Sequence, residues 1–116
     1  MSWGTVEIEP EVEVWLKNLP SRSFGRAERY IDLLAERGVE LGEPYSRQLR
    51  RKLRELRFDL EGEAIRISYY IHPGRRIVLL TVFRKTRRRE RREIARALRA
   101  MSRCIAEQHD AEEDRE

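Results

Sequence analysis

The chain has 116 residues, which is enough for one small domain, and its 25 basic and 21 acidic residues give a net charge of +4. No apolar segment approaches the roughly 20 residues of a membrane span, and the N-terminus lacks a signal-peptide pattern. One cysteine excludes an internal disulfide and a Cys-rich zinc site. We therefore expect a cytoplasmic domain that uses no metal and no other cofactor.

The charges are unevenly distributed along the chain. The last ten residues, 107–116, hold six acids and one base, so residues 1–106 carry 24 bases and 15 acids, a net charge of +9. One basic run extends from Arg84 to Arg103, and a second from Arg47 to Arg57. Two such runs in so small a domain indicate a polyanionic partner, although each could also be a solvated face. We expect one domain over residues 1–106 and a disordered acidic tail over residues 107–116.

The first half of the chain predicts a short strand and two helices. Residues 5–9 alternate between apolar and acidic side chains, which is typical of an edge strand. Apolar residues at three- and four-residue spacing predict a helix over residues 11–19 and a second helix that Ser21 or Ser23 caps and that stops at Gly38. The second helix should turn Phe24 and Ile31 towards the core. We expect the two helices to form a hairpin packed on a sheet.

The second half predicts three strands and a final helix. Residues 53–58 predict a strand with Leu56 and Phe58 inward. Residues 77–83 are a continuous apolar run, which predicts a strand in a central position of the sheet. Residues 64–71 alternate strictly, with an exposed polar face that continues to the next residue and consists of Arg66, Ser68, Tyr70 and His72. The last helix should run from about Arg87 to Ala106 with its arginines outward. The order β-α-α-β-β-β-α describes an α+β domain with a mostly antiparallel sheet packed against a helical hairpin and a C-terminal helix.

Several short motifs follow one another in this second half. Leu53-Arg54-Glu55-Leu56-Arg57 is followed by Arg66 and Tyr69 in one strand, by Phe83-Arg84-Lys85-Thr86 at the end of the next strand, and by Glu93-Ile94 and Ala97 in the last helix. Each motif alone is weak. In this order, over residues 4–103, they resemble the RelE/ParE toxin superfamily, and most of all its HigB-like, phage-derived branch.

The resemblance implies the toxin of a type II toxin–antitoxin system, with a helix-turn-helix antitoxin as its partner. Many relatives are endoribonucleases that cut mRNA on the ribosome without a metal and so inhibit translation: the ribose 2′-hydroxyl is the nucleophile, and basic side chains stabilise the phosphorane. Such a reaction needs cations aimed at the non-bridging oxygens and a group that moves protons. We expect Arg57, Arg66 and Lys85 to supply the cations.

The proton-transfer group is the point at which the chain departs from its active relatives, many of which carry a Tyr or His near the C-terminus. Tyr70, on the same predicted face as Arg66, is the best candidate here, ahead of His72 in a predicted turn and His109 in the tail. Glu55 suits a salt bridge that orients an arginine better than it suits a general base. The further arginines that we expect to bind RNA are Arg54, Arg84, Arg88, Arg91, Arg92, Arg96 and Arg99.

Two other functions stay open at this point. A ParE-like inhibitor of DNA gyrase needs no catalytic residues, and the missing Tyr or His in the last helix favours it slightly. The chain could also be a non-catalytic, arginine-rich RNA-binding module, but no helix-turn-helix, zinc-finger or basic-zipper pattern supports a plain nucleic-acid-binding domain.

Overall fold

The structure, a computed structural model, describes residues 2–88 and 90–113, with side chains up to Gln108. Within these residues, no helix is both long and apolar enough to cross a membrane. The elements are β1 (Thr5–Ile8), α1 (Pro10–Lys17), α2 (Ser21–Arg37), the 3₁₀ helix η1 (Gly38–Glu40), β2 (Ser46–Arg50), β3 (Leu53–Leu60), β4 (Glu63–His72), β5 (Arg76–Arg84) and α3 (Glu90–Glu113).

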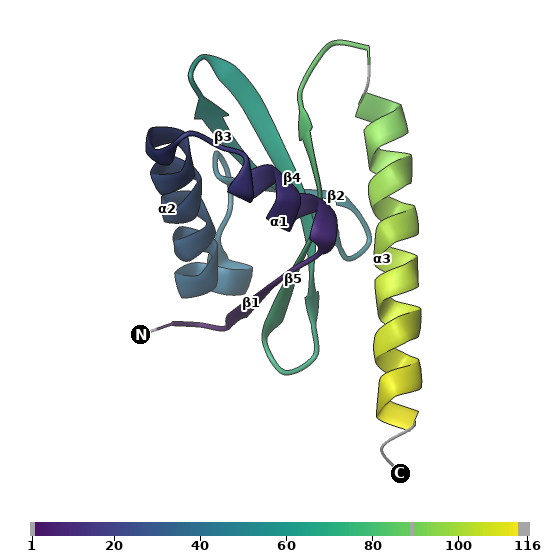
Figure 1. Ribbon diagram of the computed structural model, residues 1–116. Helices are drawn as coiled ribbons and strands as arrows, with labels where there is room; N and C mark the ends of the chain where they lie inside the picture. Colours follow the sequence, from purple (N-terminus) through teal and green to yellow (C-terminus); the bar gives the residue numbers. More distant parts are fainter. Residues whose placement is uncertain (1, 89, 114–116) are drawn as a thin grey trace.

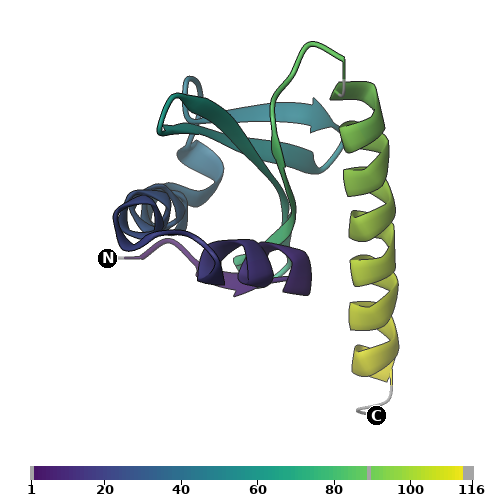
Figure 2. The same cartoon turned by 45° about the horizontal axis from the view of Figure 1, so that its top comes forward.

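The strands form one five-stranded sheet in the order β1-β5-β4-β3-β2. β1 runs parallel to β5, and all other neighbours are antiparallel. Helices α1 and α2 cover one face of the sheet, and α3 lies along the other, as Figures 1 and 2 show from two directions. The structure therefore confirms the α+β class and the mostly antiparallel sheet. It also confirms the helical hairpin with a separate C-terminal helix.

β2 is the element that the sequence pattern does not reveal. It is an edge strand that pairs with β3, and its sequence Ser-Arg-Gln-Leu-Arg holds a single apolar residue. Alternation between apolar and polar side chains is therefore almost absent, and the pattern indicates only a basic stretch. The observed order has four strands, not three, between α2 and α3.

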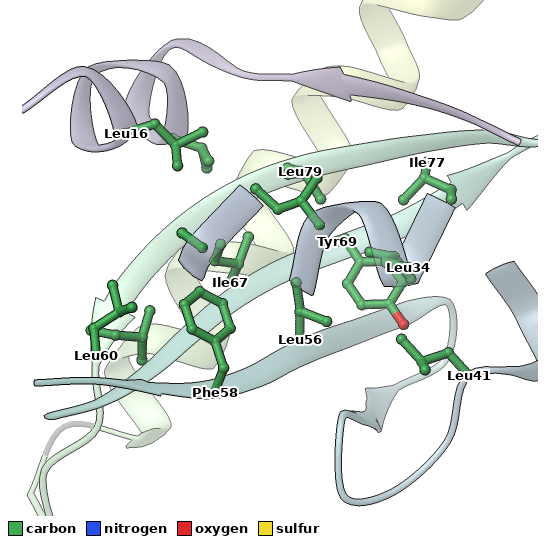
Figure 3. Close-up of a cluster of buried hydrophobic side chains, with 14 residues drawn as sticks. Leu16, Leu34, Leu41, Leu56, Phe58, Leu60, Ile67, Tyr69, Ile77 and Leu79 are labelled. Atoms are coloured by element: carbon green, nitrogen blue, oxygen red, sulfur yellow. The ribbon is translucent and has the colours of Figure 1, made fainter. Parts of the chain in front are cut away.

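The face of the sheet beneath α1 and α2 carries the larger apolar core (Figure 3). Alternate residues of the three central strands point into it, because successive side chains of a strand point to opposite faces. Ile31 of α2 is buried as predicted, but Phe24 keeps 39% of its surface exposed. Phe24 lies in the first turn of α2, where it lines an open groove together with Ile8 and Leu16.

The opposite face is covered by α3 over part of its length. Leu53, Tyr70 and Val78 of the sheet pack there against Ala97, Met101 and Cys104 of α3, among others. The predicted polar face of β4 is consequently not exposed: Arg66, Ser68, Tyr70 and His72 are all buried. His72 is also the last residue of β4, not part of the turn that follows.

The two ends of α3 differ from the prediction. The helix begins at Glu90, and Arg87 and Arg88 form a turn between β5 and α3. At its other end α3 continues to Glu113, beyond the expected end at Ala106, because residues 107–113 contain no Gly or Pro that would stop a helix. The first seven residues of the expected tail are thus helical. Residues 114–116 and the side chain of His109 lie outside the described part of the chain.

Candidate nucleic-acid interface

Arg57 and Arg66 lie directly opposite each other on β3 and β4, as expected for neighbouring strands. Glu55 is two residues before Arg57 on β3 and therefore shares the face of the sheet on which α3 lies. One carboxylate oxygen of Glu55, Oε2, is 3.6 Å from Nε of Arg57 and 3.9 Å from Nε of Arg66. The two guanidinium groups are thus held on either side of one carboxylate, which agrees with the predicted salt-bridge role of Glu55.

Burial makes this cluster more than a surface ion pair. Glu55 is 2% exposed and Arg66 is 8% exposed, whereas the side chain of Arg57 keeps 23% of its surface. Arg66 also donates a hydrogen bond from Nη1 to the carbonyl oxygen of Ile65 at 3.0 Å. The Nε of Arg57 is buried and makes no hydrogen bond within the described residues. The exposed position expected for Arg66 is therefore wrong, because the neighbouring side chains of the sheet enclose it.

The ionisation of the cluster follows from that burial. Loss of solvent raises the pKa of Glu55, although the charges of Arg66, Arg57 and Arg47 oppose the change. Burial likewise lowers the pKa of Arg66, and the like charge of Arg57 adds to the effect. An arginine nevertheless remains charged in proteins, so the cluster keeps two positive groups.

Lys85 directly follows β5, which ends at Arg84. Its backbone N–H donates to the carbonyl oxygen of Ala64 at 2.8 Å, which continues the pairing of β4 with β5. Phe83, two residues before Lys85, pairs with Arg66, so Lys85 is placed on the same face as Arg66. Its side chain is exposed. The three cations predicted to act together thus lie on one side of the sheet.

A groove of about 300 Å³ opens beside the cluster, where β3 extends past the beginning of β2. We call it the edge groove; its lining includes Arg26, Tyr30, Tyr45, Arg57 and Arg66. The sequence pattern does not reveal Arg26, Tyr30 and Tyr45 as residues of the site. Tyr45 directly follows Pro44 between the second predicted helix and the next predicted strand, and an aromatic residue after a proline is the signal that the sequence offers for it.

Tyr70 does not belong to this groove. It is 1% exposed and lies beneath α3, where its hydroxyl donates to Sγ of Cys104 at 3.5 Å and lies 3.3 Å from Nδ1 of His72. Burial raises the pKa of Tyr70 above its ordinary value, and the hydrogen bond to Cys104 adds to the effect. The prediction that Tyr70 shares an open face with Arg66 is therefore wrong.

Three of the arginines expected to bind RNA are engaged elsewhere. Arg54 is on the other face of the sheet, where its Nε lies 3.4 Å from the hydroxyl oxygen of Tyr69. Arg84 forms a salt bridge with Glu63 at 2.7 Å. Arg96 pairs with Glu11 of α1 and with Glu93, and it donates to the carbonyl oxygen of Val82 at 3.2 Å.

Arg96 therefore joins α3 to α1 and β5. Although partial burial opposes the change, the hydrogen bonds to the two carboxylates raise the pKa of Arg96. The remaining predicted RNA-binding residues have exposed side chains, either in the turn before α3 or on the helix itself; they are Arg88, Arg91, Arg92 and Arg99. Within the described residues, no group of three or more His, Cys, Asp or Glu side chains is arranged to hold a metal ion.

Comparisons with known proteins agree with this architecture. Residues 14–102 match the family described as phage derived protein Gp49-like (DUF891). No curated protein matches the sequence.

Three solved structures share the fold at low sequence identity. A mutant of the Escherichia coli toxin RelE in the free state has a TM-score of 0.58 at 14% identity, over 89% of this chain and 98% of that one. The toxin–antitoxin complex RelBE2 from Mycobacterium tuberculosis has a TM-score of 0.55 at 20% identity, over 71% and 98%. The archaeal RelE–RelB complex from Pyrococcus horikoshii OT3 has a TM-score of 0.53 at 21% identity, over 75% and 99%.

The family match covers most of the chain, and the sheet with its flanking helices is that of the RelE structures. The chain therefore belongs to the Gp49-like family of phage-derived proteins, and it shares its fold with the RelE structures.

Proposed function

We propose that the chain is the toxin of a type II toxin–antitoxin system and that it inhibits translation as a metal-independent mRNA endoribonuclease on the ribosome. The observation that carries this proposal is the pair of Arg57 and Arg66, which face each other across two strands beside a buried carboxylate and line the edge groove. Two guanidinium groups fixed side by side suit a phosphate group, because each can donate to a different non-bridging oxygen.

In the proposed reaction, the ribose 2′-hydroxyl gives its proton to water as its oxygen attacks the adjacent phosphorus, and negative charge grows on the non-bridging oxygens. The bond from phosphorus to the 5′-oxygen then breaks, and the 5′-oxygen takes a proton from water. Arg57 and Arg66 donate hydrogen bonds to that growing charge. They do so with little rearrangement, because the strands and Glu55 already hold them in place. Lys85, exposed at the end of β5, adds positive charge on the same side of the sheet. Glu55 acts through the two arginines, since it is itself almost fully buried.

The proposed partners are a helix-turn-helix antitoxin, the ribosome and mRNA. One of the structures with this fold is the toxin–antitoxin complex RelBE2 and another is a complex of RelE with RelB, which supports the first of these partners. The exposed arginines at the start of α3 support a polyanionic partner such as ribosomal RNA. We assign the chain to the HigB-like branch of the superfamily on the motifs between Leu53 and Ala97.

The test is controlled expression in bacteria. Induction of the chain alone should stop growth, and co-expression of the neighbouring helix-turn-helix gene should restore it. Transcriptome-wide mapping of mRNA 5′ ends after induction should then show discrete cuts in phase with the reading frame. Unimpaired growth at verified expression of folded protein would contradict the toxin assignment.

The same experiment distinguishes the other two functions. Growth arrest with altered DNA supercoiling and without mRNA cuts would identify a ParE-like gyrase inhibitor. Ribosome association with neither cuts nor supercoiling changes would identify a non-catalytic RNA-binding module.

A further inference from the structure

Tyr45 exposes an aromatic ring beside the arginines of the edge groove. The residue keeps 39% of its surface accessible. Its neighbour Tyr30 has two other partners: its ring stacks on Phe58 with centroids 4.9 Å apart and an interplanar angle of 10°, and the guanidinium of Arg26 lies 5.7 Å from the ring centroid. The ring of Tyr45 is tilted by 41° to that of Tyr30 at 6.2 Å, so the two rings do not stack on each other.

The backbone holds Tyr45 in this place. Its N–H donates to the carbonyl oxygen of Gly42 at 3.0 Å, and its own carbonyl oxygen accepts from the N–H of Arg57 at 2.8 Å. The second bond joins Tyr45 directly to the residue that carries one of the two paired guanidinium groups. The backbone of Tyr45 is therefore fixed beside that of Arg57, and Tyr45, Arg57 and Arg66 line the same groove.

This combination of an exposed ring and two arginines suits one chemical class of ligand. A nucleotide of single-stranded RNA offers a flat base that stacks on an aromatic side chain and a phosphate that accepts hydrogen bonds from arginine. An acidic peptide would satisfy the guanidinium groups but would leave the ring of Tyr45 without a partner. A volume of about 300 Å³ is at the lower end of ligand sites, which fits one base rather than several.

We propose that Tyr45 is the stacking surface for a single unpaired RNA base next to the phosphate bound by Arg57 and Arg66. The proposal rests on the proposed RNA substrate and adds to it the residue that holds the flanking nucleotide. Base stacking is tolerant of sequence, because every base has a flat face. The subsite therefore requires an unstacked base at this position and favours single-stranded over paired RNA.

The test compares two short oligonucleotides of equal length and charge, both 2′-O-methylated so that neither can be cleaved. One carries bases throughout, and the other carries an abasic site at its central nucleotide. Affinities are measured by fluorescence anisotropy at low salt for the wild type, Tyr45→Phe and Tyr45→Leu. Phe24→Leu is the matched control, since Phe24 has the same exposed fraction as Tyr45 but lies outside the edge groove.

We expect the wild type and Tyr45→Phe to bind the complete oligonucleotide about fivefold or more tightly than the abasic one, which is the lower range for one stacked base. Tyr45→Leu should lose this preference, and Phe24→Leu should keep it. Equal affinity of the wild type for the two oligonucleotides, weak or strong, would overturn the proposal, as would a preference that survives in Tyr45→Leu.

Failure of this proposal and failure of the proposed function are distinguishable. If the wild type binds both oligonucleotides equally but still cuts mRNA in cells, only the proposed stacking subsite is wrong and the proposed function stands. A base preference that depends on Tyr45 in a protein that makes no cuts supports the subsite and contradicts the nuclease. Thermal unfolding of each variant confirms that it is folded before its affinity is interpreted.

Discussion

Arg66 and Tyr70 lie on the same strand and point to the same side of the sheet, yet their surroundings differ completely. Tyr70 is enclosed beneath α3 in contact with Cys104 and His72. Arg66 faces Arg57 and lines the edge groove. Strand alternation determines which face a side chain takes, whereas a helix more than 20 residues further along the chain determines whether that face is covered. The polar face expected of β4 is thus buried throughout, but its two ends differ: α3 encloses the end with Tyr70, which we call the closed end, and the edge groove borders the end with Arg66, which we call the open end.

The strongest test of this difference is Arg66→Ala. If the open end carries the chemistry, the variant should lose RNA cleavage by about 100-fold or more, the usual cost of removing one donor to a developing oxyanion. Because Arg66 is buried beside Glu55, we also expect a loss of stability of about 1–3 kcal/mol. Cleavage rates and chemical denaturation measure the two effects separately.

Arg66→Lys is the matched control for that experiment. It keeps a positive charge near Glu55 but loses the planar pair of donors, so stability should recover more than cleavage does. Full cleavage by folded Arg66→Ala would show that the open end does not hold the reacting phosphate.

The second test concerns the arginines outside the groove. Replacing Arg88, Arg92 and Arg99 by Gln should weaken binding to ribosomes and flatten its dependence on salt by roughly one unit of slope per lost phosphate contact. Arg96→Gln should leave that slope unchanged, because Arg96 is engaged by Glu11 and Glu93. An equal effect of Arg96→Gln on the slope would mean that its ion pairs open on binding.

The third test addresses the closed end. Tyr70→Phe removes a buried hydroxyl that contacts Cys104 and His72, so the free energy of unfolding should fall by about 1 kcal/mol. Cleavage by the folded variant should not change. If cleavage falls strongly and stability does not, Tyr70 belongs to the catalytic site, and the two ends of the face do not differ in function.

The smallest expected effect is a difference in pH dependence between two glutamates. At the closed end, the hydrogen bonds from Arg76 lower the pKa of Glu7, so Glu7 contributes stability above pH 4.5 that is lost as the pH falls through its folded pKa. At the open end, burial raises the pKa of Glu55. The Glu55 carboxyl therefore ionises at a lower pH in the unfolded chain than in the folded one. As a result, the free energy of unfolding falls as the pH rises from 4.5 through the folded pKa of Glu55.

Denaturation of the wild type, Glu7→Gln and Glu55→Gln between about pH 3 and pH 7 measures these slopes. Glu7→Gln should lose part of the acid sensitivity. Relative to the wild type, Glu55→Gln should gain stability as the pH rises. The same sign for both glutamates would contradict the different surroundings assigned to the two ends.

The sequence predicts the fold well because most elements carry a strong period. The strict alternation of β4 and the apolar run of β5 identify the central strands, and the motifs from Leu53 onwards place Arg57 and Arg66 on neighbouring strands. The missed features depend on contacts between distant segments. Tyr45 comes next to Arg57 only through the backbone hydrogen bond between them, which joins two segments separated by β2. Arg96 contacts Glu11 only because α3 packs beside α1.

The parallel pairing of β1 with β5 has a consequence for how the chain folds. Strands β2 to β5 form a meander of neighbours in sequence, whereas Thr5 of β1 pairs with Arg76 of β5, which lies far along the chain and beyond the rest of the meander. Closing the long loop between β1 and β5 is slow unless β5 is already part of a formed sheet with a free edge. We therefore expect β1 to pair with β5 after the folding transition state. Stopped-flow measurements should show that Val6→Ala mainly accelerates unfolding and that Ile67→Val slows folding. A φ-value near one for Val6 would reverse this order, and the N-terminal strand would then belong to the folding nucleus.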